Sequence, residues 1–228
     1  AFLVAFKIPN FLRRLFAEGA FSQAFVPVLS DVRAQRGDDA VRQLINHVAG
    51  TLTLIIGSLT AVAMVFSPAI IFIFAPGFHD DAVRFDLAAD MLRITFPYLL
   101  LISLTAFAGG ILNTYGRFGA SSFTPVLLNL TMIACAIWLA PLLTTPIMAL
   151  AWGVLIAGIV QLGFQWLPLR QINLVPRFKP NFKDPDVKRI LTLMLPAMFG
   201  VSVSQINLLL DTILASFLVA GSVSWLYT

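Results

Sequence analysis

The sequence predicts an all-α integral membrane protein with six transmembrane helices. Of its 228 residues, 59% are hydrophobic and 11% are charged, and the mean hydropathy is +0.90. A soluble domain carries roughly 25% charged residues, so a water-soluble fold is excluded. The charges are also missing from long runs, and a helix needs about 20 apolar residues to cross the bilayer core. These runs are apolar at consecutive positions, unlike the alternating strands of a membrane β-barrel.

The first three spans lie in the N-terminal half. One runs from the N-terminus to about Leu29, the next lies within Gln43–Phe78, and the third is Ile94–Gly116. The chain opens Ala1-Phe2-Leu3 without Met, a basic n-region or a small-residue cleavage site, so the first span is not predicted to be a signal peptide. The sequence stops at Thr228 in the middle of an apolar pattern. We therefore expect a fragment of a longer protein.

The longest uncharged run, Phe118–Leu169, supplies the fourth and fifth spans. Pro141 and Pro146 flank a Leu-Leu-Thr-Thr stretch inside it, which predicts a tight turn between two helices. The sixth span contains the uncharged run Ile190–Leu210.

Basic residues alternate between the five connections. The first, third and fifth connections (31–46, 113–122 and 170–189) hold ten Lys and Arg residues, and the second and fourth (75–93 and 141–146) hold two. By the positive-inside rule the odd connections are cytoplasmic and the first residues face outside. The net charge of +4 then reflects the orientation of the chain in the membrane, and the basic residues are expected to contact anionic lipid headgroups. No basic cluster with interleaved aromatic residues predicts a nucleic-acid partner.

The longest connection, residues 170–189, is the predicted domain boundary. Prolines in it and at its border prevent a continuous helix, so we expect a short amphipathic or extended cytoplasmic linker. These prolines are Pro168, Pro176, Pro180 and Pro185. The linker separates residues 1–169, with five helices, from residues 190–228, with one.

Charged residues inside a span are functional candidates, because a charge at the bilayer centre costs about 2.5 to 3.5 kcal/mol on insertion scales. The first helix holds three of them: Arg13, Arg14 and Glu18. Arg14 and Glu18 are four residues apart and can pair. Arg13 points about 100° away from the Arg14–Glu18 pair around the helix axis. It lies above small residues at Ala17, Ala20 and Ala24. This face can border a cavity in which the guanidinium binds phosphate or diphosphate oxygens; the alternative is that both arginines snorkel to an interface.

Asp211 is the other charge inside a span. A carboxylate there is protonated, paired with a cation or an Arg from another helix, or bound to a metal ion such as sodium. The alternative is a carboxylate that faces a water-filled vestibule. Gln161 and Gln165 are expected to form interhelical hydrogen bonds, and the small residues Ala149, Gly153 and Ala157 a close helix contact.

No catalytic motif points to an enzyme. The sequence contains no H-E-x-x-H, P-loop or G-x-S-x-G pattern. His79-Asp80-Asp81 places its candidate ligands side by side, so we expect a solvated loop and no metal site. The single cysteine, Cys135, excludes a disulfide framework and is expected to fill space in a helix contact.

Four stretches carry recognisable motifs: Lys7-Ile-Pro-Asn-Phe-Leu-Arg-Arg through Phe-Val-Pro-Val-Leu-Ser30, which is the clearest, Ala75-Pro-Gly-Phe78, Ile94–Phe118 and Gly200–Trp225. They resemble the MurJ (MviN) family, the lipid II flippases of bacterial cell-wall synthesis. The resemblance covers nearly all of this chain but less than half of a fourteen-helix protein. It aligns the chain with helices two to seven, without the first and the eighth to fourteenth helices.

The resemblance implies the multidrug/oligosaccharidyl-lipid/polysaccharide exporter fold, in which two lobes form a V around a cationic cavity. Residues 1–169 would then be five helices of the N-terminal lobe, and residues 190–228 the first helix of the C-terminal lobe and the following turn. Arg13 matches the cavity arginine of the second helix, Arg14 and Glu18 lie beside it, and Asp211 is a candidate for ion coupling. No catalytic residue, bound metal or cofactor is implied; a sodium ion or the membrane potential is the candidate driving force.

The function implied is a flippase that moves lipid II, an undecaprenyl-diphosphate-linked muropeptide, from the inner to the outer leaflet of the bacterial inner membrane by alternating access. The partners are lipid II, the phospholipid bilayer and the missing helices of the full-length chain. Two alternatives remain open: a cation-coupled drug or polysaccharide-lipid exporter of the same superfamily, and a membrane enzyme that acts on polyprenyl diphosphates. A non-transporting membrane scaffold is a third class.

Overall fold

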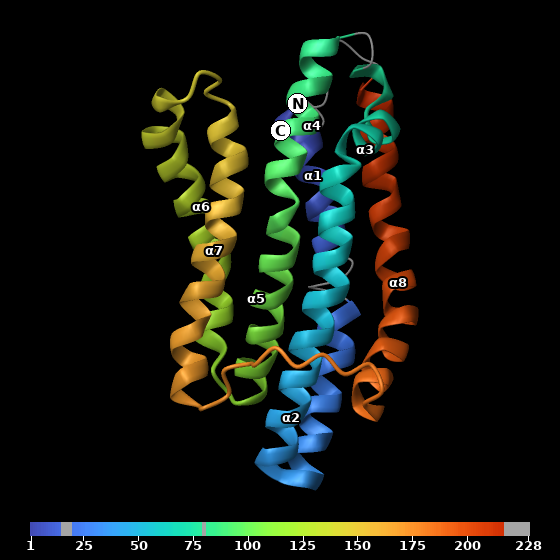
Figure 1. Cartoon of the computed structure of the whole chain (residues 1–228), viewed down its shortest axis with the longest axis vertical. Helices are drawn as coiled ribbons and strands as arrows, with labels where there is room; N and C mark the ends of the chain where they lie inside the picture. The colour runs from blue at the N-terminus through green and yellow to red at the C-terminus, as the bar shows by residue number, and fades with distance from the viewer. Residues whose placement is uncertain (15–19, 79–80, 217–228) are drawn as a thin grey trace.

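The structure is a computed structural model, and it describes residues 1–14, 20–78 and 81–216, with the backbone alone described at 201 and 203–216. Every regular element in the described part is helical, which confirms the predicted all-α class. The helices stand side by side along the long axis of the molecule (Figure 1).

The N-terminal part contains α1 (Phe2–Arg13) and the long α2 (Ser22–Val65). We expected a loop over residues 31–46, but helical geometry continues through this region and is interrupted only at Gly37, with φ 76° and ψ −174°. A glycine adopts such a positive φ without the strain that a Cβ would cause. The chain reverses direction at the lower end of α2 in Figure 1, so the first two predicted spans form a hairpin with almost no loop.

The next helices are α3 (Ser67–Phe74), a short 3₁₀ turn η2 (Pro76–Phe78), α4 (Ala82–Thr95) and α5 (Pro97–Thr114). The prediction of a loop over residues 75–93 is therefore largely wrong, because α4 occupies the second half of this range. The charges that suggested a loop are accommodated on the exposed face of α4: Arg93 pairs with Asp90 at 3.0 Å. Asp81 caps the helix by accepting a hydrogen bond from the Arg84 backbone N–H at 3.1 Å.

The C-terminal part contains α6 (Phe118–Ala134), α7 (Met148–Gln171) and α8 (Pro185–Ser216). After α6 the chain continues through the π-helical η3 (Cys135–Leu139) and the 3₁₀ helix η4 (Ala140–Leu142). The turn predicted between Pro141 and Pro146 is confirmed.

Within the predicted linker over 170–189, residues 172–184 lie between α7 and α8 and form no regular helix. Pro168 lies inside α7 and does not end it. Pro185 begins α8, and proline suits the first helical position because its missing N–H has no intrahelical partner there.

Four helical stretches of the described chain are long and apolar enough to cross a membrane: Ser22–Val65, Ala82–Thr114, Phe118–Leu142 and Met148–Gln171. The predicted count of six is not confirmed. Their outward faces carry exposed apolar side chains such as Val65 and Trp138, both 72% exposed, which is typical of a surface covered by lipid. The described part is thus a multi-pass membrane bundle.

The three basic connections meet at one end of the bundle, which we call the basic end. Arg33 donates to the Thr114 carbonyl oxygen at 2.8 Å, and Arg117 donates to Gln171 Oε1 at 3.0 Å. The other two connections lie at the opposite end in Figure 1. The alternation of basic residues therefore predicted correctly which connections share a side.

The close contact predicted along Ala149, Gly153 and Ala157 is confirmed. Ala149 and Ala157 are fully buried. A Cβ added to Gly153 would lie 3.1 Å from the Met132 sulfur and 3.2 Å from the Cys135 Cβ. Cys135 is buried and unpaired, as its expected space-filling role requires.

Candidate functional site

A polar cavity of about 450 Å³ lies between α1, α2, α5, α6 and α7. Its lining combines apolar side chains with eight polar ones: Arg13, Ser22, Thr105, Asn113, Ser121, Thr124, Gln161 and Gln165. Tyr98 of α5 is 1% exposed and also lines it. The cavity is therefore a place inside the bundle where a polar ligand can meet a guanidinium.

Arg13 reaches this cavity from the last turn of α1. Its Nε donates to Asn10 Oδ1 at 2.8 Å, which orients the guanidinium plane. Ala20 and Ala24, expected on the same face, are instead buried in the core. The helix is π-helical at Ala20 and Phe21, so the 100° spacing used for the prediction does not hold through this segment.

Of the four predicted site residues, the structure describes the side chains of Arg13 and Arg14 alone. Arg14 is exposed and is not part of the cavity lining. Glu18 lies outside the described residues, so its pairing with Arg14 stays a prediction. The backbone of Asp211 is part of α8, and its side chain is likewise outside the description.

Gln161 and Gln165 contact α6, as predicted. Gln161 Nε2 donates to the Thr124 carbonyl oxygen at 2.9 Å, and Gln165 Nε2 donates to Thr124 Oγ1 at 3.1 Å. The Thr124 hydroxyl itself donates to the Ala120 carbonyl at 3.2 Å. Both carboxamides are 1% exposed, and neither Oε1 accepts a hydrogen bond within the described structure.

Two buried acceptors without donors are costly, at about 1 to 3 kcal/mol each. They favour a ligand or water that brings hydroxyl or amide N–H groups into the cavity. The side chains that line the cavity in the described part include no carboxylate, and no group of three metal-ligating side chains occurs among the described residues. The cavity chemistry thus combines one cationic group for an anion with acceptors for neutral donors.

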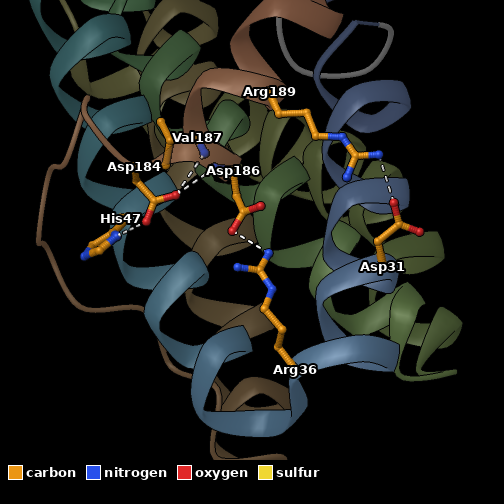
Figure 2. Close-up of polar contacts among 7 residues, drawn as sticks. All are labelled: Asp31, Arg36, His47, Asp184, Asp186, Val187 and Arg189. Atoms are coloured by element: carbon orange, nitrogen blue, oxygen red, sulfur yellow. Dashed lines mark hydrogen bonds and ion pairs between the residues drawn. The ribbon is translucent and has the colours of Figure 1, made fainter.

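The basic end carries a second polar cluster, which joins α2 to the linker and α8 (Figure 2). Arg36 pairs with Asp186 at 2.6 Å, and Arg189 pairs with Asp31 at 2.9 Å. His47 Nδ1 lies 2.8 Å from Asp184 Oδ2. Sequence analysis missed these contacts because each joins residues more than 130 positions apart.

Asp184 is the most connected residue of this cluster. Partial burial raises its pKa, but hydrogen bonds from His47 and from the backbone N–H groups of Val187 and Asp186 lower it more, so the net pKa lies below its ordinary value. A carboxylate that accepts several hydrogen bonds is stabilised in its charged form. The cluster is a structural joint, separate from the cavity that contains Arg13.

A helical bundle with an exposed apolar surface and a cavity between its helices that polar side chains line in part defines the class, a multi-pass membrane protein. The family profile described as "Lipid II flippase MurJ" matches residues 1–228. The chain therefore belongs to the MurJ family, as the sequence motifs predicted.

Curated relatives agree over the whole chain. It is 50% identical to the "Probable lipid II flippase MurJ" of Haemophilus influenzae, with 99% of this chain and 46% of the relative covered. It is 45% identical to the "Lipid II flippase MurJ" of Burkholderia cenocepacia, with 99% and 45% covered. A solved structure titled "Lipid II flippase MurJ, inward closed conformation" superimposes with a TM-score of 0.79 at 30% identity, covering 99% of this chain and 46% of that one. The chain thus spans less than half the length of these relatives.

Proposed function

We propose that this chain forms part of a lipid II flippase. Its full-length protein would move an undecaprenyl-diphosphate-linked muropeptide from the inner to the outer leaflet of the bacterial inner membrane by alternating access. The observation that carries the proposal is Arg13 in the polar cavity, supported by relatives named as lipid II flippases.

The physical problem of such a transporter is the cost of moving a charged, sugar-bearing headgroup through hydrocarbon. A buried group that loses water needs replacement hydrogen bonds. Arg13 would supply charge-assisted bonds to diphosphate oxygens, which are among the stronger hydrogen bonds in proteins. Gln161 and Gln165 line the same cavity and offer acceptors. The lipid tail would remain in the bilayer throughout.

Three further residues have proposed roles. Arg14 and Glu18 would tune or gate the diphosphate site, and Asp211 would couple the cycle to an ion such as sodium. The membrane potential is the other proposed driving force, worth about 2.3 kcal/mol per charge per 100 mV. A flippase is a transporter and not an enzyme, so lipid II should leave the cycle chemically unchanged.

Replacing Arg13 tests the proposal. In vesicles that contain the full-length protein, Arg13→Ala should slow translocation of labelled lipid II by about tenfold or more, because a hydrogen bond to a charged group contributes about 1.5 to 3 kcal/mol. Arg13→Lys should retain part of the rate, since it keeps the charge without the planar fork. The control is Arg93→Ala on the exposed face of α4. Undiminished translocation by Arg13→Ala would refute the proposed role.

A further inference from the structure

A second cavity, of about 460 Å³, lies at the basic end between α2, α7 and the linker. Three arginines from these three elements line it: Arg42, Arg170 and Arg177. The guanidinium carbon of Arg170 lies 5.8 Å from the centre of the Trp166 ring. No function described above uses these residues.

Within the described ranges, no acidic side chain pairs with the arginines of this cavity. No carboxylate lines it, and none of the three arginines forms an ion pair with any residue in the described ranges. Arg36 and Arg189, at the same end, are both paired with aspartates. Three guanidinium groups that line one cavity repel one another, so the cavity favours an anionic ligand.

The walls of the cavity are held in place by backbone contacts. The Arg177 backbone N–H donates to Asn46 Oδ1 of α2 at 2.7 Å. The Leu174 backbone N–H donates to the Leu169 carbonyl oxygen at the end of α7 at 3.1 Å. The linker is thereby fixed against both helices, and the arginine cluster is a formed site.

An apolar groove of about 270 Å³ adjoins this cavity and shares Trp166 and Arg177 with it. Its other lining residues include Leu104 and Phe107 of α5 and Leu162 of α7. Tryptophan at the end of a spanning helix is typical of the membrane interface. The cationic cavity therefore borders a groove that is lined mainly by apolar side chains.

We infer that this compound site binds an anionic phospholipid of the cytoplasmic leaflet. The positive-inside rule places the basic end on the cytoplasmic side, where basic pockets between helices bind lipid headgroups. The arginines contact the phosphate diester, and one acyl chain occupies the groove beside Leu162. The bound lipid bridges α2, α7 and the linker, and so braces the segment that leads into α8. This site is distinct from the cavity proposed for the transported lipid.

Native mass spectrometry of the purified full-length protein with phosphatidylglycerol tests the inference. The variant Arg42→Gln/Arg170→Gln/Arg177→Gln should bind this lipid about 100-fold more weakly, from the energy that basic residues gain near an anionic membrane surface. The matched control, Lys179→Gln/Lys183→Gln/Lys188→Gln, removes three exposed charges from the same region and should bind normally. Phosphatidylcholine should bind weakly to all three proteins.

Two further experiments distinguish a bound phospholipid from a small phosphate ester and from a polyprenyl diphosphate. Leu162→Trp narrows the groove and should weaken phosphatidylglycerol binding at least severalfold while leaving binding of glycerol 1-phosphate unchanged. Undecaprenyl diphosphate should not displace phosphatidylglycerol from the site at equal concentration. The inference is overturned if the arginine variant and the lysine control bind phosphatidylglycerol equally. It is also overturned if glycerol 1-phosphate binds as tightly as the phospholipid, or if undecaprenyl diphosphate displaces it.

Discussion

Asp184 uses its two carboxylate oxygens for different contacts. One oxygen lies 2.8 Å from His47 Nδ1 of α2. The other accepts from the backbone N–H groups of Asp186 at 2.9 Å and Val187 at 3.2 Å, which makes Asp184 the N-cap of α8. A single residue therefore both starts α8 and attaches it to α2 (Figure 2).

Removing this carboxylate should destabilise the protein. Asp184→Ala should lower the free energy of unfolding of the full-length protein in detergent by about 1 to 3 kcal/mol, the range for lost caps and buried hydrogen bonds. Asp184→Asn should cost less, because its amide oxygen can still cap the helix. Asp90→Ala, which removes an exposed carboxylate from α4, is the control. Equal unfolding midpoints for Asp184→Ala and Asp90→Ala would contradict the capping role.

The same residue gives this stability a defined pH dependence. The folded-state pKa of Asp184 lies below its ordinary value of 3.8. A lowered pKa means that the contribution is present above 3.8 and is lost as pH falls through the folded-state pKa. The difference in stability between the wild type and Asp184→Asn should therefore shrink in that acidic window, as measured by thermal unfolding.

At the scale of elements, hydrophobic patterning predicted the spans better than their connections. Charge-free runs located the helices, because lipid must cover a spanning helix. Charges did not reliably mark loops, since α4 carries paired charges on an exposed face. The reversal in α2 depends on the backbone of Gly37 alone, and no periodicity reveals which glycine adopts a positive φ.

Gly50 of α2 shows how closely the linker packs on the helices. A Cβ at Gly50 would lie 2.6 Å from the Lys179 carbonyl carbon and would also collide with the Pro180 backbone. Gly50→Ala should therefore destabilise the full-length protein by about 1 to 3 kcal/mol, because the backbone of the linker has to move. Thermal unfolding in detergent measures the effect.

Gly57, two turns further along the same helix, is the matched control. Nothing lies within 4 Å of a Cβ placed there, so Gly57→Ala should be neutral or stabilising by about 0.5 to 1 kcal/mol from helix propensity. If Gly50→Ala is as stable as Gly57→Ala, the linker does not cross α2 at this point.

At the scale of the whole molecule, the sequence predicted a cationic side chain at the site, but it did not predict which other residues line the cavity. A charge inside a span is expensive, and this principle alone singled out Arg13, which lines the cavity. Ser22, Tyr98 and Asn113 carry no such signal, because small polar and aromatic residues are common throughout spanning helices. They line the cavity only because α1, α2 and α5 converge, and that convergence depends on contacts between distant segments.

We propose that Arg13 holds the diphosphate of lipid II in this cavity. Equilibrium binding of lipid II to the detergent-solubilised full-length protein tests it most directly, with Arg93→Ala as the control. We predict that Arg13→Ala raises the Kd by about tenfold or more, and that Arg13→Lys gives an intermediate value. A Kd for Arg13→Ala equal to that of the wild type and of Arg93→Ala would contradict the claim.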